Sequence, residues 1–426
     1  MFKILKDLSL FNSILKKGGV IFILKLIAMP ISFFAYWFIP NKFGEADLGF
    51  FTLALTILQV FYLVFALGLP HAFLAFSGGF ENDYQKKGFL LKSSLIALSV
   101  SLIPFCVLFF GSNFIASNVF KKEEFSVFLS ITAFAIPFMI LHEILCYFFI
   151  SIGKHFIYSI LLFIIPNVLF SFFLILSSEL NLSSYSVFLS YVIGFFITVV
   201  IGFLLAFLKE LKFVIPKIST YEILKKSFPM MVGTIFLLLL NWTDILMLGR
   251  LETEENIGIY NISFKLGYLT LFFVSAMGSA IIADVSEKYN LKDFSGLKKT
   301  INKATQLTAI LTLPVALVLI FFSSYFLSFF GEEFIQGKQA LILITIGAFF
   351  NAVTGNVDQI LNMTGNETTV RNVMFFGFVI NVILNIVLIP LYGYEGAAFS
   401  SLLVNIVVNT IFVIVIRKRL GFYTFI

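Results

Sequence analysis

Long apolar stretches recur along the whole chain, and short segments that carry most of the charged residues separate them. Each stretch holds about twenty residues, the length of helix that crosses a hydrocarbon core of about 30 Å. The segments of a membrane β-barrel are shorter, about ten residues, and alternate between apolar and polar side chains. The pattern therefore predicts an all-α integral membrane fold with about twelve transmembrane helices. The predicted helices cover residues 18–39, 48–70, 93–112, 125–150, 156–177, 185–208, 226–249, 257–283, 305–328, 340–363, 371–390 and 396–416.

The composition agrees with a membrane protein. Of the 426 residues, 60% are hydrophobic and only 12% are charged, whereas about 25% are charged in a soluble domain. The first apolar stretch runs past twenty residues without a small-residue cleavage site, so we expect a retained helix and not a signal peptide.

The basic residues gather in alternate polar segments. On one side of the predicted helices lie 22 of the 29 Lys and Arg residues, and the other side holds five of them against eleven acidic residues. The positive-inside rule then predicts a cytoplasmic (inner or plasma) membrane protein with both termini in the cytoplasm. The net charge of +6 is explained by this sorting, and no soluble basic cluster indicates a nucleic-acid partner.

The two halves of the sequence repeat each other at a nearly constant offset. The offset rises only from 209 to 214 residues over four pairs, which are Gly49 and Gly258, Pro104 and Pro314, Gly153 and Gly365, and Asn167 and Asn381.

This repeat predicts two six-helix bundles. Because six is an even number of helices, both repeats enter the membrane from the same side, which predicts a parallel pseudo-two-fold repeat like that of two-lobed transporters. We expect an N-terminal lobe at 1–208, a cytoplasmic connector at 209–226, a C-terminal lobe at 227–416 and a cytoplasmic tail at 417–426. A transporter of this design has its substrate path between the lobes.

Several segments resemble one family of membrane transporters. The segment 381–398, with Asn381 and Asn385 followed by the Pro, Gly and Ala residues of a turn, resembles the eleventh-to-twelfth-helix turn of the polysaccharide flippase family. That family belongs to the multidrug/oligosaccharidyl-lipid/polysaccharide exporter superfamily. Segments 244–249, 257–266 and 360–365 are similar to other parts of its pattern, so the resemblance covers the whole chain.

The resemblance implies a function and its partners. A flippase of this family moves an oligosaccharide linked to a polyprenyl diphosphate, an O-antigen or capsule repeat unit, from the cytoplasmic to the outer leaflet. The expected partners are this lipid, the membrane lipids, a coupling proton or sodium ion, and other polysaccharide-assembly proteins. The alternatives are a multidrug or organic-cation exporter of the same superfamily and, from another class, a polytopic glycosyltransferase or polymerase.

Two lysines lie inside the predicted helices, where a charge costs about 2.5–3.5 kcal/mol. Lys25 lies about seven residues into the first helix and Lys265 lies in the outer third of the eighth. Because a diphosphate needs cations in place of its water, we interpret both as substrate-binding residues for the diphosphate. Each lysine also has the simpler reading that it extends to the nearer membrane interface.

Three polar residues inside helices are candidates for ion coupling or for lining a cavity. Asp244 lies in the seventh helix with Asn241 one turn earlier, and Asp358 belongs to a polar stripe of the tenth helix. A structural bond between helices is the alternative for each. Two further stripes recur every four residues, and we expect them to bond to each other across packed helices. They are Gly377, Asn381 and Asn385, and Ser401, Asn405 and Asn409.

The motifs of several enzyme classes are absent from the sequence. The segment from Gly331 to Lys338 lacks the spacing and the Ser/Thr of a P-loop. No Cys/His metal spacing and no Gly-x-Ser-x-Gly elbow occur. We therefore expect no catalytic residue, no metal and no cofactor.

Overall fold

The computed structural model describes residues 2–208 and 210–425, with side chains described except at 2–20, 22, 229–230, 232–234, 236–238, 240–241, 279–280 and 283. Every regular element in these residues is helical. The chain divides into two compact units. Unit 1 comprises Met1–Phe43 and Ala54–Ile235, and unit 2 comprises Gly44–Leu53 and Phe236–Ile426. The expected lobe boundaries at 208 and 226 stay a prediction.

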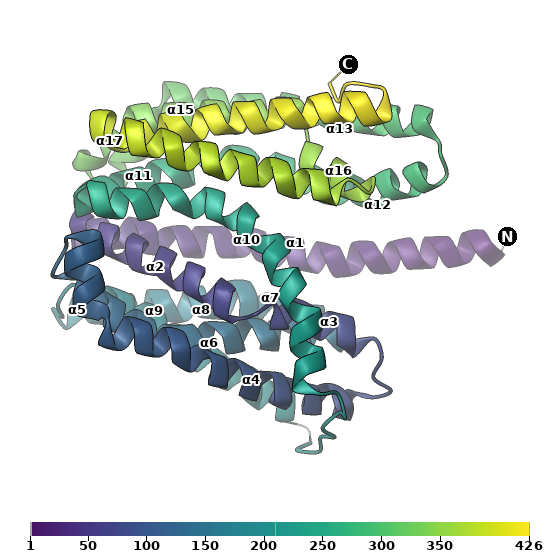
Figure 1. Cartoon of the computed structure of the whole chain (residues 1–426), viewed down its shortest axis with the longest axis horizontal. Helices are drawn as coiled ribbons and strands as arrows, with labels where there is room; N and C mark the ends of the chain where they lie inside the picture. The colour runs from purple at the N-terminus through teal and green to yellow at the C-terminus, as the bar shows by residue number, and fades with distance from the viewer. Residues whose placement is uncertain (1, 209, 426) are drawn as a thin grey trace. The chain divides into compact units, whose positions relative to one another are not determined.

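Unit 1 contains most of the elements up to residue 235 (Figure 1). In chain order they are α1 (Phe2–Lys42), α2 (Glu45–Phe65), α3 (Leu69–Ser77), α4 (Asp83–Phe110), α5 (Ser112–Phe114), η1 (Ile115–Phe120), α6 (Phe125–Ser151), α7 (His155–Ser159), η2 (Ile160–Ile164), α8 (Ile165–Glu179) and α9 (Tyr185–Phe207). The first turns of α2 belong to unit 2, and α10 (Thr220–Leu251) runs from unit 1 into unit 2.

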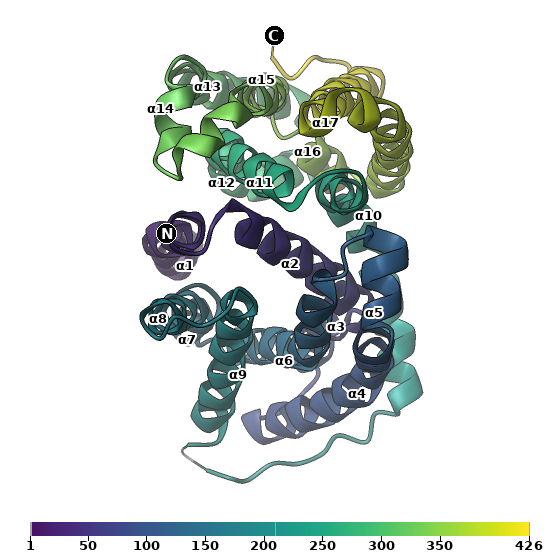
Figure 2. The same cartoon turned by 90° about the vertical axis from the view of Figure 1, so that its left-hand side faces the viewer.

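Unit 2 contains the remaining helices, which Figure 2 shows nearly end on. They are α11 (Glu254–Tyr268), η3 (Leu269–Leu271), α12 (Phe272–Asn290), α13 (Phe294–Phe321), α14 (Ser323–Ser328), η4 (Glu332–Gly337), α15 (Lys338–Thr354), α16 (Val357–Met363) and α17 (Glu367–Leu420). Within this unit α15 packs against α11, α13 and α17.

The helices account for twelve membrane spans. Among the described residues, ten candidate spans are long and apolar enough to cross a bilayer. The longest, α17, is two helices, because Gly393 has non-helical backbone angles of φ 59° and ψ −142°. The helix α10, whose 32 residues include side chains outside the described set, is also long enough to cross a bilayer. The predicted all-α fold of about twelve transmembrane helices is confirmed.

The repeat is visible in the order of long and short elements. In unit 1 the short helix α3 follows the second long helix, and α5 with η1 follows the third. In the second half of the chain, α14 with η4 follows α13 in the same way, whereas α12, which follows α11, has 19 residues against the 9 of α3. Pro104 lies inside α4 and Pro314 inside α13, at the positions matched in sequence.

Two pairs of repeat-related residues meet within unit 2, where the first turns of α2 pack on α11. A Cβ on Gly49 would lie 1.8 Å from the carbonyl oxygen of Glu254, and one on Gly258 would lie 2.7 Å from that of Glu45. One turn further, Asn261 Nδ2 donates to Thr52 Oγ1 at 2.6 Å. Gly49 pairs with Gly258 in the sequence repeat, and Thr52 with Asn261 at the same offset. Such reciprocal contacts are typical of a two-fold axis.

The segment between α9 and α10 is extended and lies along α4 in unit 1. Val214 N donates to the carbonyl of Tyr84 at 3.0 Å, and Lys87 Nζ donates to the carbonyl of Glu210 at 2.9 Å. Gly88 makes this approach possible, because a Cβ there would lie 2.0 Å from the carbonyl oxygen of Val214. Only a residue without a side chain lets the two backbones approach so closely.

Candidate functional site: a polar cavity in unit 2

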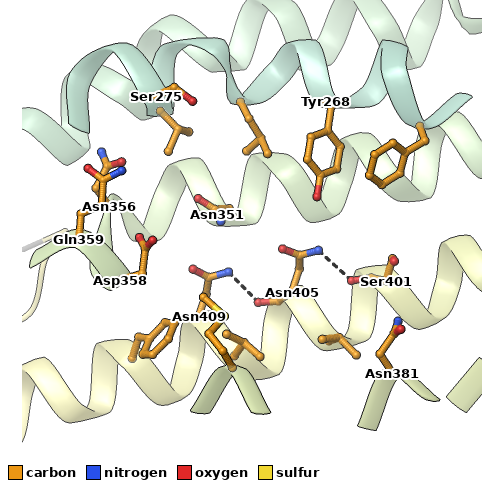
Figure 3. Close-up of a pocket in the computed structure, with 17 residues that line it drawn as sticks. Tyr268, Ser275, Asn351, Asn356, Asp358, Gln359, Asn381, Ser401, Asn405 and Asn409 are labelled. Carbon is orange, nitrogen blue, oxygen red and sulfur yellow. Dashed lines mark hydrogen bonds between the residues drawn. The ribbon is translucent and has the colours of Figure 1, made fainter. Parts of the chain in front are cut away.

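A cavity of about 240 Å³ lies among α11, η3, α12, α15, α16 and α17. Figure 3 shows its lining, to which polar and apolar side chains both contribute. The polar lining residues are Tyr268, Ser275, Asn351, Asn356, Asp358, Gln359, Asn381, Ser401, Asn405 and Asn409. The lining thus offers amides and hydroxyls with a single carboxylate, inside a region made of membrane-spanning helices.

The second half of α17 contributes a ladder of polar side chains to the cavity. Ser401, Asn405 and Asn409 recur every four residues and so share one face of the helix. Asn405 Nδ2 donates to the carbonyl of Ser401 at 2.9 Å, and Asn409 Nδ2 donates to the carbonyl of Asn405 at 2.8 Å (Figure 3). These bonds hold the two amide groups against their own helix and fix their orientation along one wall.

A helix break brings a second group of polar residues to the cavity. The helix α15 ends at Thr354, and Gly355 takes φ 82° and ψ −171°, a conformation that favours glycine. The short helix α16 then begins and presents Asp358 and Gln359. Irregular backbone within a membrane is tolerated where it is buried in protein or lines a cavity. The break therefore serves to place Asp358 at the cavity wall.

Asp244 lies deeper, beside the cavity, and is almost fully buried at 1% exposure. Its Oδ1 accepts hydrogen bonds from Asn381 Nδ2 at 3.1 Å and from Asn385 Nδ2 at 2.6 Å. Its Oδ2 accepts from Tyr260 Oη at 2.6 Å and from Ser401 Oγ. One carboxylate thus joins α10, α11 and both halves of α17.

The four hydrogen-bond donors to Asp244 among the described residues are all neutral groups. The amide oxygen of Asn385, which is itself fully buried, has no hydrogen-bond partner among the described residues. A buried carboxyl group and a buried unpaired amide oxygen therefore belong to the same hydrogen-bonded cluster.

The other residues predicted from the sequence are distributed over both units. Asp358 is half-buried and lines the cavity. Lys265 is half-buried on α11 of unit 2, and Lys25 is exposed on α1 of unit 1. The side chain of Asn241 lies outside the described residues. The roles of these residues and of Asp244 stay predictions.

The two polar stripes of α17 differ from the expectation that they bond to each other. Asn381 and Asn385 donate to Asp244 on α10, whereas Asn405 and Asn409 lie on the cavity wall. Asn405 and Asn409 were not expected to be cavity residues. The sequence does show that Asn405 and Asn409 share one helix face with Ser401. It does not show whether that face contacts another helix or lines a cavity.

Unit 1 also holds buried polar groups, on α6. Glu143 is hydrogen-bonded to Tyr62, and Tyr147 Oη lies 2.9 Å from His71 Nδ1. His142 Nε2 lies 3.0 Å from the carbonyl oxygen of Leu161, within the π-helical turn η2. These contacts join α6 to α2, α3 and η2.

Two protein families match long segments of the chain. The polysaccharide biosynthesis protein family matches residues 14–287, which is more than half of the chain. The chain belongs to this family. The MatE family matches residues 229–387, and the resemblance to the polysaccharide flippases of the multidrug/oligosaccharidyl-lipid/polysaccharide exporter superfamily is confirmed.

The chain is similar to two membrane proteins from Haloferax volcanii and Methanocaldococcus jannaschii. A probable low-salt glycan biosynthesis flippase, Agl15, of Haloferax volcanii is 24% identical over 40% of the chain, and the alignment covers 36% of that relative. The membrane protein MJ1068 of Methanocaldococcus jannaschii is 21% identical over 88% of the chain and 78% of its own length. The chain thus aligns with about a third of the first relative and most of the second.

Two solved structures share the fold of this family member. One is the lipid II flippase MurJ in an inward closed conformation, with a TM-score of 0.75, 18% identity, and coverage of 93% of the chain and 87% of MurJ. The other is an inward-facing multidrug resistance MATE family transporter, with a TM-score of 0.76, 12% identity, and coverage of 92% and 94%. The chain is thus a multi-pass membrane protein that shares the helical fold of both structures.

Proposed function

We propose that the protein flips an oligosaccharide linked to a polyprenyl diphosphate, an O-antigen or capsule repeat unit, from the cytoplasmic to the outer leaflet by alternating access. The observation that carries this proposal is the match of residues 14–287 to the polysaccharide biosynthesis protein family. The naming of a similar protein as a glycan biosynthesis flippase supports the same substrate class. In this proposal both termini are cytoplasmic, and the protein works beside other polysaccharide-assembly proteins.

Lys25 and Lys265 receive the diphosphate in this proposal. Each lies within a membrane-spanning helix, where a charged side chain needs a partner such as the diphosphate. A diphosphate that leaves water needs such cationic donors.

Asp244 is the residue we propose for coupling to a proton or a sodium ion. A carboxylate within a membrane-spanning bundle is costly without a compensating charge, and the four groups that donate hydrogen bonds to Asp244 are neutral. In this proposal a bound cation supplies that charge, and the Asn385 amide oxygen, which has no hydrogen-bond partner among the described residues, is a further ligand for it. Asp358 is a second carboxylate for the same purpose, at the cavity wall.

The test is flipping of a fluorescent polyprenyl-diphosphate oligosaccharide in proteoliposomes. We expect flipping by the wild type, a strong reduction in Lys25→Ala and Lys265→Ala, and loss of its dependence on an ion gradient in Asp244→Asn. The similarity to a multidrug transporter favours export of organic cations as the second candidate. Efflux of cationic dyes without any lipid flipping would select that candidate.

A further inference from the structure

The chemistry of the unit 2 cavity differs from that of a phosphate site. Its lining residues carry amides, hydroxyls and one carboxylate, and no Lys or Arg is among them. A phosphate or diphosphate is held by cationic groups, which this lining lacks. An amide both donates and accepts hydrogen bonds, and so does a hydroxyl group. The lining therefore matches a ligand rich in hydroxyl groups.

Some of this hydrogen-bonding capacity is unused by the protein itself. No hydrogen bond of the Asn351 side chain is seen among the described residues, and Figure 3 shows this amide pointing into the cavity opposite Asn405. The buried Oε1 of Gln359 likewise has no partner among the described residues. The half-buried amide of Asn351 can therefore both donate to and accept from a ligand in the cavity.

Aromatic rings complete the lining on the side of α11. Phe264 and Tyr268 stack with their ring centroids 4.1 Å apart, and both line the cavity. The apolar face of a sugar ring packs on such surfaces while its hydroxyl groups reach the amides. The volume of about 240 Å³ lies below the roughly 300–1,000 Å³ of pockets for drug-sized ligands. It suits one sugar ring and excludes a whole oligosaccharide.

We propose that the cavity of unit 2 binds one sugar ring of the lipid-linked oligosaccharide through its hydroxyl groups, separately from the site that receives the diphosphate. This inference rests on the proposed flippase function and specifies the part of the substrate that this cavity takes. Asn351 and Asn405 recognise the ring from facing helices, and their loss weakens binding of the sugar without affecting binding of the diphosphate.

The experiment measures binding of two lipids to the full chain in nanodiscs. One lipid is polyprenyl diphosphate, and the other is the same lipid carrying a single hexose or N-acetylhexosamine. The variants are Asn351→Leu and Asn405→Leu. The matched control is Asn167→Leu, because Asn167 in α8 donates to the carbonyl of Phe163 at 2.8 Å in the same manner as Asn405 but lies in unit 1.

We expect the wild type to bind the sugar-bearing lipid more tightly than the bare lipid. Each cavity variant should lose about tenfold in affinity for the sugar-bearing lipid, the size of one good hydrogen bond. Affinity for the bare lipid should stay the same in both variants, and Asn167→Leu should behave as the wild type. Equal affinity of the wild type for both lipids, or an equal loss for both lipids in the cavity variants, would overturn the inference and leave the flippase proposal intact.

A second measurement separates the two proposals if neither lipid binds. In a Cys106→Ser background, the labelling rate of a Ser275→Cys variant by a small thiol reagent reports access to the cavity, since Ser275 lines it. Slower labelling in the presence of soluble methyl glycosides would support the sugar site even though the lipid-flipping function had failed. Unchanged labelling together with absent lipid binding would overturn both.

Discussion

Removing the Asp244 carboxylate should destabilise the fold by an amount that follows from its four hydrogen bonds. In Asp244→Ala the donors of Tyr260, Asn381, Asn385 and Ser401 lose their common acceptor. Hydrogen bonds between membrane helices average about 0.6 kcal/mol each, so four of them give about 2.4 kcal/mol. Asp244→Asn keeps the shape and one acceptor oxygen, and the hydroxyl groups can rotate to accept from its amide. We therefore expect Asp244→Asn to cost less than about 1 kcal/mol.

The free energy of unfolding can be measured in mixed detergent micelles by circular dichroism. The two variants separate the structural role of Asp244 from its proposed ion coupling, because Asp244→Asn should fold and yet lose the ion dependence of transport. Equal stability of Asp244→Ala and the wild type would refute the view that this carboxylate joins α10, α11 and α17. A large destabilisation in Asp244→Asn would refute the expectation that an amide of the same shape can replace the carboxylate.

Two further predictions concern polar ends of the helices. Gly88→Ala should displace the segment before α10, because the new Cβ would lie 2.0 Å from the carbonyl oxygen of Val214. The displaced segment should be cleaved faster by trypsin than in the wild type. The control is Gly79→Ala, where the nearest neighbour of the new Cβ lies at 3.5 Å, and it should be cleaved at the wild-type rate. The hydrogen bond from Lys288 lowers the pKa of Asp284. The stability that the Asp284 carboxylate contributes is therefore fully present above the ordinary aspartate pKa of about 3.9. This stability is lost as the pH falls through the lowered pKa. Asp284→Asn should therefore unfold more readily than the wild type at neutral pH, and the difference should vanish in strong acid; a constant difference would contradict it.

The fold was predictable because its main signals are local or periodic. The length of the apolar stretches is set by the thickness of the bilayer, and four pairs of residues, Gly49 and Gly258 among them, indicated the repeat at a nearly constant offset. The structure adds that these two glycines lie at one helix crossing, where each Cβ would meet a backbone carbonyl of the other segment. That contact joins residues more than two hundred positions apart, and no local pattern contains it.

The candidate site was predictable only in part. The sequence shows that Asp244 lies alone in an apolar helix, where a charged side chain raises the free energy of insertion into the membrane. The spacing of Asn405 and Asn409 shows that they share a helix face. What that face meets depends on the packing of α17 against α15 and on the break at Gly355. These are tertiary features, so the same stripe was compatible with a helix contact and with a cavity wall.

Ser401 connects the cavity with the buried carboxylate, and this connection has a consequence for transport. Its side chain lines the cavity and donates a hydrogen bond to Asp244. Asn381 does the same from the other half of α17. With a cation bound at Asp244, as proposed above, these two side chains would offer different hydrogen bonds to a ligand, and a ligand that engages them would change the coordination of the cation. Since such coupling is reciprocal, Ser401→Ala should reduce the effect of the ion on sugar-lipid affinity and, by the same factor, the effect of the lipid on ion affinity. Paired titrations of one ligand at fixed concentrations of the other measure both factors, and coupling that persists unchanged in Ser401→Ala would show that this hydroxyl group does not carry it.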